Sequence, residues 1–225
     1  MLICIEGIDG SGKATQSQLL VNALRDRYGD ERVLTMSFPR YGQSFFAREV
    51  GAYLNGERGT LAQVHPRFSA ILFAGDRFQA KPELEQALAG GKIVVCDRYV
   101  ASNTAHQGAR LPAAEREAFY HWNDELEHQV FGLPRPHVNF FIDVPPHVAW
   151  ELVAKKKARD YTDKQRDIQE AEAGYLQEVY RVYQDLAASQ RWTVLPCLQA
   201  GELKTPQQIF SELWEALLAT GQLPS

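Results

Sequence analysis

The chain has 225 residues, enough for one domain over residues 1–225 with a sizeable buried core. Hydrophobic residues make up 45% of it and charged residues 23%, a balance that excludes an intrinsically disordered protein. The formal net charge of −4 argues against broad electrostatic binding to nucleic acid. No apolar run approaches the roughly 20 residues that cross a bilayer, so we expect neither a nucleic-acid nor a membrane partner.

Three cysteines, Cys4, Cys96 and Cys197, lie in apolar runs and show no metal-ligand spacing. We expect them to be buried, reduced thiols, which are typical of an intracellular protein. A strand-like run begins at Leu2 and leaves no room for a signal peptide, so the expected location is the cytoplasm.

Predicted strands and helices alternate along the chain. The expected strands are five short apolar runs: Leu2–Ile5, Val33–Met36, Lys92–Cys96, Val138–Val144 and Trp192–Cys197. Helical spacing of apolar residues begins near Leu19 and recurs over Ala114–Val130, Ala171–Ala188 and Pro206–Leu218. Because the strand runs are too apolar for a sheet with one wet face, they predict an α/β fold with a parallel sheet covered by helices on both faces. Ligands of such sheets bind at the carboxyl ends of the strands.

A glycine-rich segment, G-I-D-G-S-G-K over Gly7 to Lys13, follows the first predicted strand and opens the first helix. This context distinguishes a phosphate-binding P-loop from a chance match. Glycines let several backbone N–H groups converge on phosphate oxygens, and the helix amino end adds a partial positive charge. Lys13 supplies an ammonium group for the β- and γ-phosphates. The expected triphosphate-binding residues are Gly7, Ile8, Asp9, Gly10, Ser11, Gly12, Lys13, Ala14 and Thr15.

The residue after the lysine is Ala14, where such loops usually carry a Ser or Thr whose hydroxyl joins the Mg²⁺ shell. A methyl group cannot bind Mg²⁺, which requires oxygen ligands. Either water completes the shell, or phosphates and other carboxylates hold the ion. Thr15 comes next, but the role does not simply pass to it.

Asp97-Arg98-Tyr99 closes the third predicted strand. At that place Asp97 can reach Mg²⁺ through water or position the phosphate loop, and Arg98 offers a planar fork for a second phosphate. The alternative is a surface ion pair.

Residues 155–166, K-K-K-A-R-D-Y-T-D-K-Q-R, follow the fourth predicted strand and carry six basic residues but no aliphatic core residue. Next to a phosphate loop we interpret them as a basic lid; the alternative is a solvated face.

The segment D-R-Y-V-A-S-N-T-A-H-Q-G, from Asp97 to Gly108, resembles the signature of thymidylate kinases. The phosphate loop, F-P-R-Y-G from Phe38 to Gly42, and L-F-A-G-D-R from Leu72 to Arg77 resemble the same family in the same order. The resemblance implies a three-layer P-loop kinase fold with a five-stranded parallel sheet. It also implies transfer of the γ-phosphoryl group of ATP to dTMP, with Mg²⁺ as the cofactor.

The resemblance also implies roles at the dTMP site. Phe73 would stack on thymine, unless it is a core residue, and Arg77 would bind a thymine carbonyl, unless it pairs with Asp76 or another acid. Asn103 has the donor and acceptor that read a pyrimidine edge. Arg98 and Arg40 would hold the acceptor phosphate, with Tyr41 near it, unless Arg40 is only a solvated loop residue. Ser102 and Gln107 complete the expected site.

Two further positions concern the sugar. Asp9 would accept a hydrogen bond from the 3′-hydroxyl or contact Mg²⁺, unless it only forms the turn. His106 lies where relatives often carry an aromatic residue near C2′, so exclusion of ribonucleotides is less assured; the alternative is a structural histidine.

Some thymidylate kinases carry a catalytic arginine inside the phosphate loop, at the place of Gly10 here. We therefore expect the lid to supply that charge, through Arg159 first and Arg166 second. Asp167 and Glu170 follow the lid on one helical face and would seat the sugar or the metal, unless they only favour the helix dipole. The expected metal ligands are Asp9, Asp97 and Glu170.

The family resemblance suggests a homodimer, with the helix around Phe68 to Phe78 as a contact surface. Two rival functions stay open. One is a deoxynucleoside kinase or another nucleoside monophosphate kinase, although a nucleoside acceptor would need a carboxylate base. The other is a nucleotide-binding switch that phosphorylates no small molecule.

Overall fold

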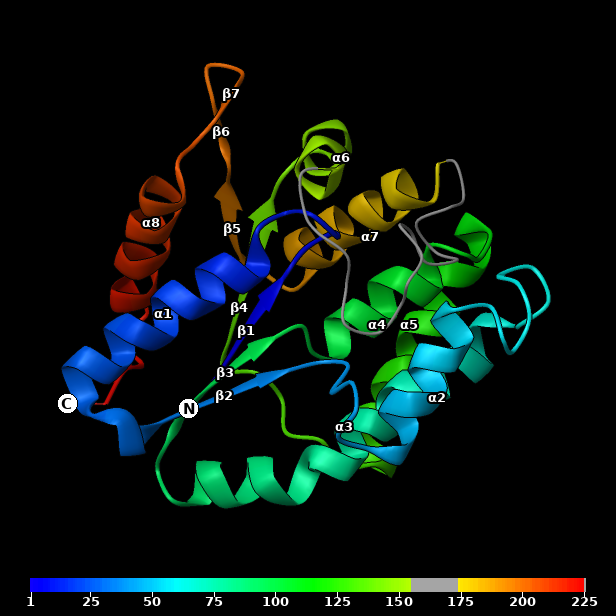
Figure 1. Ribbon diagram of the computed structural model, residues 1–225, viewed down its shortest axis with the longest axis horizontal. Helices are drawn as coiled ribbons and strands as arrows, with labels where there is room; N and C mark the ends of the chain where they lie inside the picture. Colours follow the sequence, from blue (N-terminus) through cyan, green and yellow to red (C-terminus); the bar gives the residue numbers. More distant parts are fainter. Residues whose placement is uncertain (155–173, 225) are drawn as a thin grey trace.

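The computed structural model describes residues 1–154 and 174–224 (Figure 1). A parallel sheet at its centre has the strand order β2-β3-β1-β4-β5. These strands are β1 (Leu2–Glu6), β2 (Val33–Ser37), β3 (Ile93–Asp97), β4 (Val138–Asp143) and β5 (Thr193–Pro196). Each lies within one residue of its predicted bounds, because short β-branched runs between turn residues define a buried strand well. The predicted α/β P-loop kinase fold is therefore confirmed.

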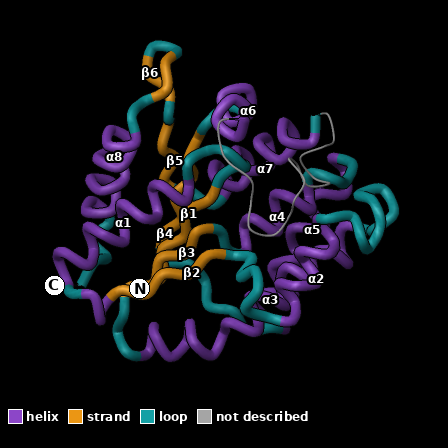
Figure 2. The backbone as a smooth tube through the Cα atoms, viewed as in Figure 1, coloured by secondary structure: helices purple, strands orange, loops and turns teal. Residues whose placement is uncertain are grey.

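Helices cover both faces of this sheet (Figures 1 and 2). On one face lie α1 (Lys13–Tyr28) and α8 (Pro206–Ala219), which pack against each other. On the other lie α3 (Pro66–Ala89), α4 (Val100–Gly108) and α7 (Tyr175–Ser189). The remaining helices are α2 (Phe45–Leu54), α5 (Ala113–Asp124) and α6 (Pro146–Ala154). Of these, α2 packs on α3.

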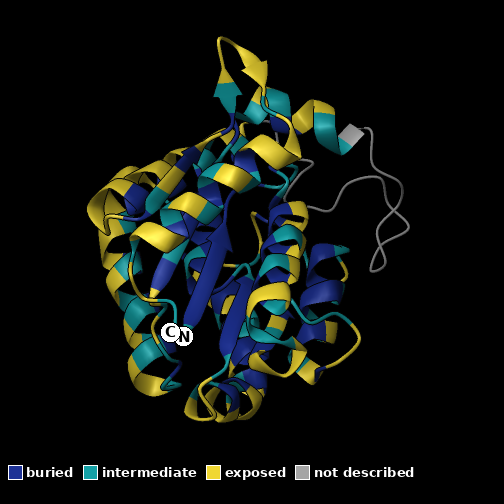
Figure 3. Ribbon diagram, turned by 90° about the vertical axis from the view of Figure 1, so that its left-hand side faces the viewer, coloured by how far each residue is buried: buried dark blue, intermediate teal, exposed yellow. Residues whose placement is uncertain are grey.

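Alternating side chains of β1 and β3 belong to different cores. Ile3 and Ile5 pack in the cluster that contains the apolar face of α1. Leu2 and Cys4 pack instead with Leu84 and other residues of α3. The sheet is thus enclosed between helices whose outer surfaces are exposed, as Figure 3 shows. The three cysteines are buried, as predicted.

The structure differs from the predicted elements in several places. Ala114–Val130 was expected to be one helix, but α5 ends at Asp124 and a π-helical turn follows over Glu125–Val130. The periodicity also did not indicate the length of α3, whose buried face includes the charged pair Asp76 and Arg77. A small hairpin of β6 (Leu198–Gln199) and β7 (Glu202–Leu203) was not predicted, and a 3₁₀ turn (Asp30–Arg32) precedes β2.

Three loops meet at the carboxyl ends of the central strands. β1 leads into the glycine-rich loop, β2 leads into the loop before α2, and β3 leads through Arg98 and Tyr99 into α4. Because the strands are parallel neighbours, these loops come together at one edge of the sheet, which is where the sequence predicts ligands.

Candidate active site

The glycine-rich loop is closely packed against α6. Gly10 has a φ of +82°, and a Cβ at this position would lie 2.4 Å from the backbone oxygen of Ala149 and 2.7 Å from Val153 Cγ2. Glycine is therefore required both for the backbone conformation and for the space. No arginine side chain fits here without moving α6.

Lys13 lies at the first position of α1 and is 6% exposed. Its Nζ donates a hydrogen bond of 2.7 Å to the backbone oxygen of Ile8, within the loop itself. Burial, reinforced by the nearby Arg98 cation, lowers the pKa of Lys13 to about 8, and Asp9 and Asp97 oppose this shift. A phosphate arriving at the loop would both stabilise the ammonium and give it a new partner.

An open cavity lies over this loop, with about 860 Å³ of empty space that includes open solvent. Its lining residues are Asp9, Gly10, Gly12, Lys13, Ala14, Ser37, Phe38, Pro39, Tyr41, Asp97, Arg98 and Val153. Gly12 caps α1 without a side-chain hydrogen bond, which leaves the helix amino end to an anion. We call this the donor cavity.

Asp97 presents a carboxylate to the donor cavity, and its Oδ1 is buried with no hydrogen-bond partner among the described residues. A buried carboxylate oxygen beside phosphates suits Mg²⁺, which usually keeps several waters and binds one or two carboxylates. Ala14 lines the cavity, whereas Thr15 is exposed and is not one of the lining residues. Within residues 1–154 and 174–224, no cluster of three or more His, Cys, Asp or Glu side chains forms. A metal here would therefore need phosphate and water oxygens.

Arg98 contacts residues from several parts of the site. Its φ of +67° is uncommon for a residue with a side chain, and such strain concentrates at functional sites. Its Nη2 donates a 2.7 Å hydrogen bond to Asp9 Oδ1. This ion pair links the residue that follows β3 to the phosphate loop. Burial alone would lower the pKa of Arg98, but the surrounding acids, Asp9 first, raise it. The other terminal nitrogen, Nη1, lies near Gly7 O (3.3 Å), Ser102 Oγ (3.2 Å), His106 Nε2 (3.2 Å) and Tyr183 OH (3.5 Å).

A buried carboxylate, Glu6, is linked to this arginine through Ser102. Glu6, at the end of β1, is fully buried and accepts hydrogen bonds from Ser102 Oγ (2.6 Å) and Tyr183 OH (3.1 Å). It also accepts from the backbone N–H of Tyr99 (2.8 Å). Burial raises the pKa of Glu6, and the hydrogen bonds and the Arg98 charge oppose that shift. The network thereby links the ends of β1 and β3 to α4 and α7.

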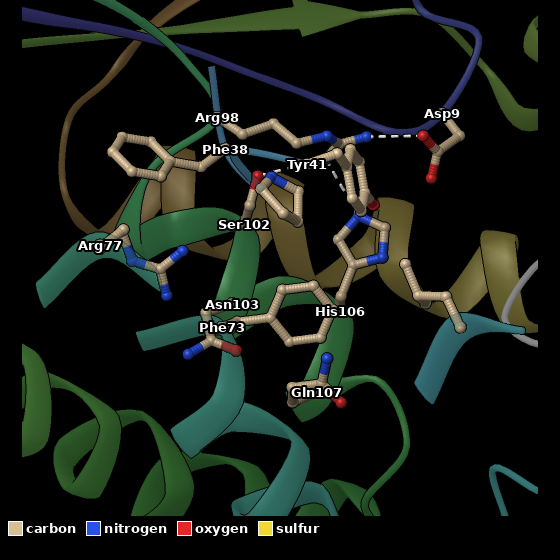
Figure 4. Close-up of a pocket in the computed structure, with 12 residues that line it drawn as sticks. Asp9, Phe38, Tyr41, Phe73, Arg77, Arg98, Ser102, Asn103, His106 and Gln107 are labelled. Atoms are coloured by element: carbon tan, nitrogen blue, oxygen red, sulfur yellow. Dashed lines mark hydrogen bonds and ion pairs between the residues drawn. The ribbon is translucent and has the colours of Figure 1, made fainter. Parts of the chain in front are cut away.

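A second cavity, with about 490 Å³ of empty space that includes open solvent, extends from Arg98 between α3 and α4 (Figure 4). We call it the acceptor cavity. Its lining residues are Asp9, Phe38, Pro39, Tyr41, Leu54, Phe73, Arg77, Arg98, Ser102, Asn103, His106 and Gln107. In Figure 4, Arg98 and Asp9 lie at one end of this cavity, and Phe73, Asn103 and Gln107 at the other.

The structure brings nine of the ten expected dTMP-site residues together in this cavity, and Arg40 is the exception. The guanidinium of Arg40 instead contacts Gln43 Oε1 (3.2 Å from Nη2) and Glu83 Oε2 (3.2 Å from Nη1). Its backbone N–H donates to Asp76 Oδ2 at 2.7 Å. Asp76 thus fixes the backbone of the loop after β2, while the side chain of Arg40 lies outside both cavities.

Arg77 is almost fully buried and makes a bidentate ion pair. Its Nε and Nη2 donate to Glu127 Oε2 (2.5 Å) and Oε1 (2.7 Å). Burial would lower the pKa of Arg77, but the Glu127 charge and hydrogen bond raise it. The structure shows the expected alternative, an ion pair of Arg77 with an acid, and also places Arg77 on the lining of the acceptor cavity; its contact with a thymine carbonyl stays a prediction.

Two amides in the acceptor cavity each have one buried atom with no partner among the described residues. Asn103 Nδ2 donates to three oxygens, while its Oδ1 is unpaired. Gln107 Oε1 accepts from Ser69 and Arg110, while its Nε2 is unpaired. Buried polar atoms without partners are costly, so these atoms suit a ligand that supplies a donor and an acceptor.

His106 is buried beside the arginine, and burial and Arg98 lower its pKa to about 3. Because Arg98 Nη1 is a donor only, His106 Nε2 accepts, which places the ring proton on Nδ1, 3.1 Å from Tyr175 OH. Tyr175 OH in turn donates to the backbone oxygen of His106 at 3.0 Å. The histidine is therefore neutral, with a fixed ring orientation.

Several expected residues lie outside the described part of the chain. They are the whole lid, residues 155–166, with Arg159 and Arg166, and the acids Asp167 and Glu170. Their roles stay predictions.

The family model described as thymidylate kinase matches residues 5–205 of this chain. The chain belongs to the thymidylate kinase family. A thymidylate kinase from Mycobacterium tuberculosis (strain H37Rv) is 37% identical over 198 residues, which cover 87% of this chain and 91% of that protein. One from a Synechococcus strain is 30% identical over 224 residues, covering 96% of this chain and 94% of that protein. The enzyme is thus a nucleoside monophosphate kinase that transfers the γ-phosphoryl group of ATP to dTMP.

Solved thymidylate kinases share the fold. The structure from Candida albicans superimposes with a TM-score of 0.71 at 20% identity, covering 98% of this chain and 92% of that one. The structure from Ehrlichia chaffeensis gives a TM-score of 0.66 at 22% identity, covering 96% of this chain and 98% of that one.

The sequence did not predict the residues that hydrogen-bond to the side chains of the site. Glu6, Glu127, Tyr175 and Tyr183 all contact predicted site residues but belong to no motif. Glu6 carried one local signal, since a carboxylate ends an otherwise apolar strand. Glu127 lies 50 residues from its partner Arg77 and carried none.

Proposed function

We propose that the donor cavity holds the phosphates of ATP and the acceptor cavity holds dTMP, so that the two nucleotides meet at Arg98. One observation carries this proposal: the cavities share the lining residues Asp9, Phe38, Pro39, Tyr41 and Arg98. Phosphoryl transfer depends on aligning donor and acceptor and on placing cations around the oxygens that change charge. A common wall with Arg98 at its centre supplies both.

Lys13 and Arg98 provide the two cations of this alignment. Lys13 leaves the oxygen of Ile8 for the β- and γ-phosphates, and Arg98 binds the dTMP phosphate while Asp9 fixes its position. No general base is needed, since a phosphate acceptor is already ionised at neutral pH. Tyr41 lines the common wall and borders the acceptor phosphate.

Thymine occupies the far end of the acceptor cavity. Arg77 Nη1, which makes no hydrogen bond within the described part of the chain, donates to the O4 carbonyl. Asn103 Oδ1 accepts the N3–H, and Gln107 Nε2 is a further donor to this end of the ligand. Phe73, which packs edge-on against Tyr53 with ring centroids 6.4 Å apart, presents a face to the base.

The sugar lies between Asp9 and His106, both of which line the acceptor cavity. Asp9 accepts from the 3′-hydroxyl. Neutral His106, held by Tyr175, faces C2′ and partly fills the space of a 2′-hydroxyl.

Asp97 and Asp9 would hold Mg²⁺, with Glu170 as a third candidate outside the described residues. When bound, the ion would supply positive charge beside the β- and γ-phosphates. Arg159 in the lid adds the cation for which Gly10 leaves no space.

We further propose a cytoplasmic homodimer that contacts neither nucleic acid nor membrane. Phe68 and Phe78 on α3 are 69% and 45% exposed, and a second copy covering this helix would bury both. No described helix is both long and apolar enough to cross a bilayer. Sedimentation of the purified enzyme tests the dimer, and a monomer at micromolar concentration would contradict it.

An acceptor panel with ATP and Mg²⁺ tests the assignment of the cavities. We expect turnover of dTMP and none of thymidine, because Arg98 requires a phosphate and the site offers no base for a 5′-hydroxyl. Phosphorylation of thymidine but not dTMP would contradict the proposal. ATP binding without turnover of any monophosphate would point to a switch.

A further inference from the structure

The turn Glu125–Val130 has an unusual backbone. After α5 ends at Asp124, the chain winds as a π-helix, a rare conformation that occurs frequently at functional sites. This turn places Glu127, whose side chain is fully buried, behind the base end of the acceptor cavity. Glu127 does not line the cavity, yet its carboxylate contacts Arg77 and Asn103, which do.

Stability alone does not explain this ion pair. The side chains of Arg77 and Glu127 are 3% and 0% exposed, and desolvating two charges costs about as much as their attraction returns. Apolar residues of similar volume commonly serve as well or better at such places. What the pair does provide is geometry: two parallel hydrogen bonds fix the plane of the guanidinium.

The fixed plane determines which group faces the ligand. Because Nε and Nη2 of Arg77 are occupied by Glu127, Nη1 is the terminal nitrogen that is left for a ligand in the cavity that Arg77 lines. The adjacent acid, Asp76, does not compete for Arg77, because its two oxygens accept from the N–H of Arg40 (2.7 Å) and from Ser44 Oγ (2.6 Å). Glu127 is thus the acid that determines where this arginine points.

We propose that Glu127 is a positioning residue that sets the preference of the enzyme for 4-oxo over 4-amino pyrimidines, by holding Arg77 as an immobile donor. The inference rests on the proposed place of thymine beside Arg77. An arginine has donors only, so it binds a carbonyl oxygen and repels an amino group unless it can turn away. The bidentate pair prevents that movement.

Two variants of Glu127 test the proposal, with kcat and KM measured for dTMP and dCMP. Glu127→Gln places an amide N–H against an arginine N–H, and Glu127→Asp keeps the charge but withdraws it by one methylene. We expect Glu127→Gln to lower kcat/KM for dTMP by about 30-fold, mainly through KM, and the dTMP:dCMP ratio by at least about tenfold. Glu127→Asp should show the same changes at a smaller size, and it carries the test if Glu127→Gln does not fold.

Asn123→Ala is the matched control. Asn123 belongs to the same buried network and accepts from Asn103 Nδ2 at 3.1 Å, but it does not contact Arg77. Asn103 keeps two acceptors for its two protons, Ala70 O and Glu127 Oε1. The dTMP:dCMP ratio should therefore stay within about twofold of wild type. A ratio that falls as far as in Glu127→Gln would show that any damage to the network relaxes selectivity, and the proposal would be wrong.

A double-mutant cycle shows whether Glu127 acts through Arg77. Arg77→Met should lower kcat/KM for dTMP, and adding Glu127→Gln should lower it no further, because the residue to be positioned is gone. An undiminished effect of Glu127→Gln in the Arg77→Met background overturns the proposal. If Arg77→Met itself leaves dTMP kinetics unchanged, the placement of the base is wrong. If Arg77→Met is impaired while both Glu127 variants keep the wild-type dTMP:dCMP ratio, only the role of Glu127 is wrong.

Discussion

The two ends of the active site satisfy their polar groups in different ways. At the base end, Arg77 donates two hydrogen bonds to Glu127, and Asn103 Nδ2 has three acceptors. At the phosphate end, Lys13 binds a carbonyl of its own loop, and Asp97 Oδ1 and Ser11 Oγ have no partner within the described residues. Both ends keep buried atoms that a ligand would satisfy, because Asn103 Oδ1 and Gln107 Nε2 also have no partner among the described residues. The ends differ in how the cation is held: a carboxylate fixes Arg77 with two hydrogen bonds, whereas Lys13 contacts only a backbone carbonyl of its own loop.

The contrast fits the work that each end performs. Selecting one base among similar bases requires donors and acceptors that do not adapt, since adaptation would admit the wrong ligand. Phosphoryl transfer requires cations around the oxygens that change charge, and Lys13 can turn from the oxygen of Ile8 to the phosphates when they bind. The following substitutions and conditions test this contrast, beginning with the largest expected effect.

Lys13→Ala should lower kcat by about 10³-fold, because it removes a cation that contacts the transferred phosphoryl group. The fold should persist, since the variant no longer buries a lysine whose pKa burial lowers. Steady-state kinetics together with thermal unfolding measure both effects. A kcat near the wild-type value would refute the role of the loop.

Arg98→Lys should lower kcat/KM for dTMP by about 10²-fold, although the positive charge is kept. A lysine cannot contact Asp9 and a phosphate with two parallel hydrogen bonds, and it would not reproduce the contacts of Nη1. Kinetics at saturating ATP measure the loss. If Arg98→Lys were as active as wild type, charge rather than geometry would suffice at this end.

The pH dependence separates activity from stability through Lys13. Its pKa is about 8 in the folded protein and 10.5 ordinarily, so kcat/KM for ATP should fall as pH rises above about 8. Between those two values the unfolded chain binds the proton and the folded chain does not, so the contribution of Lys13 to the free energy of unfolding rises with pH. Lys13→Ala should lack that rise. The account fails here if wild type and Lys13→Ala show the same pH dependence of stability.

His106→Tyr should change sugar selectivity by only a few-fold, raising the ratio of kcat/KM for dTMP over the ribonucleotide TMP as the larger ring fills the space near C2′. The neutral state of His106, with its pKa near 3, predicts no contribution from this residue to pH profiles between pH 5 and 8. An unchanged ratio would place His106 away from the sugar.

The sequence predicted what depends on local pattern. The five strands, the glycine-rich loop and nine of the residues that line the acceptor cavity follow from short motifs whose geometry is set within a few residues. It did not predict contacts made across the fold. The pairing of Arg77 with Glu127, the support of Arg98 by Glu6 and the outward turn of Arg40 depend on tertiary packing.

Gly10 illustrates both what the sequence predicts and what only the fold explains. The sequence indicated that the loop lacks an arginine there, but only the fold shows why: the backbone of α6 lies against the position where a Cβ would be. The π-helical turn at Glu125–Val130 is similar, because apolar spacing predicted a continuous helix through it.

A crystal structure of the complex with dTMP, a non-hydrolysable ATP analogue and Mg²⁺ tests the central contrast most directly. We expect the Arg77–Glu127 and Asn103–Glu127 hydrogen bonds to be unchanged, with thymine against Arg77 Nη1. We also expect Lys13 Nζ to have left the oxygen of Ile8 for the phosphates, and Asp97 to face the metal and its waters. A complex in which Lys13 stays on Ile8 while Arg77 has moved away from Glu127 to reach the base would contradict the account.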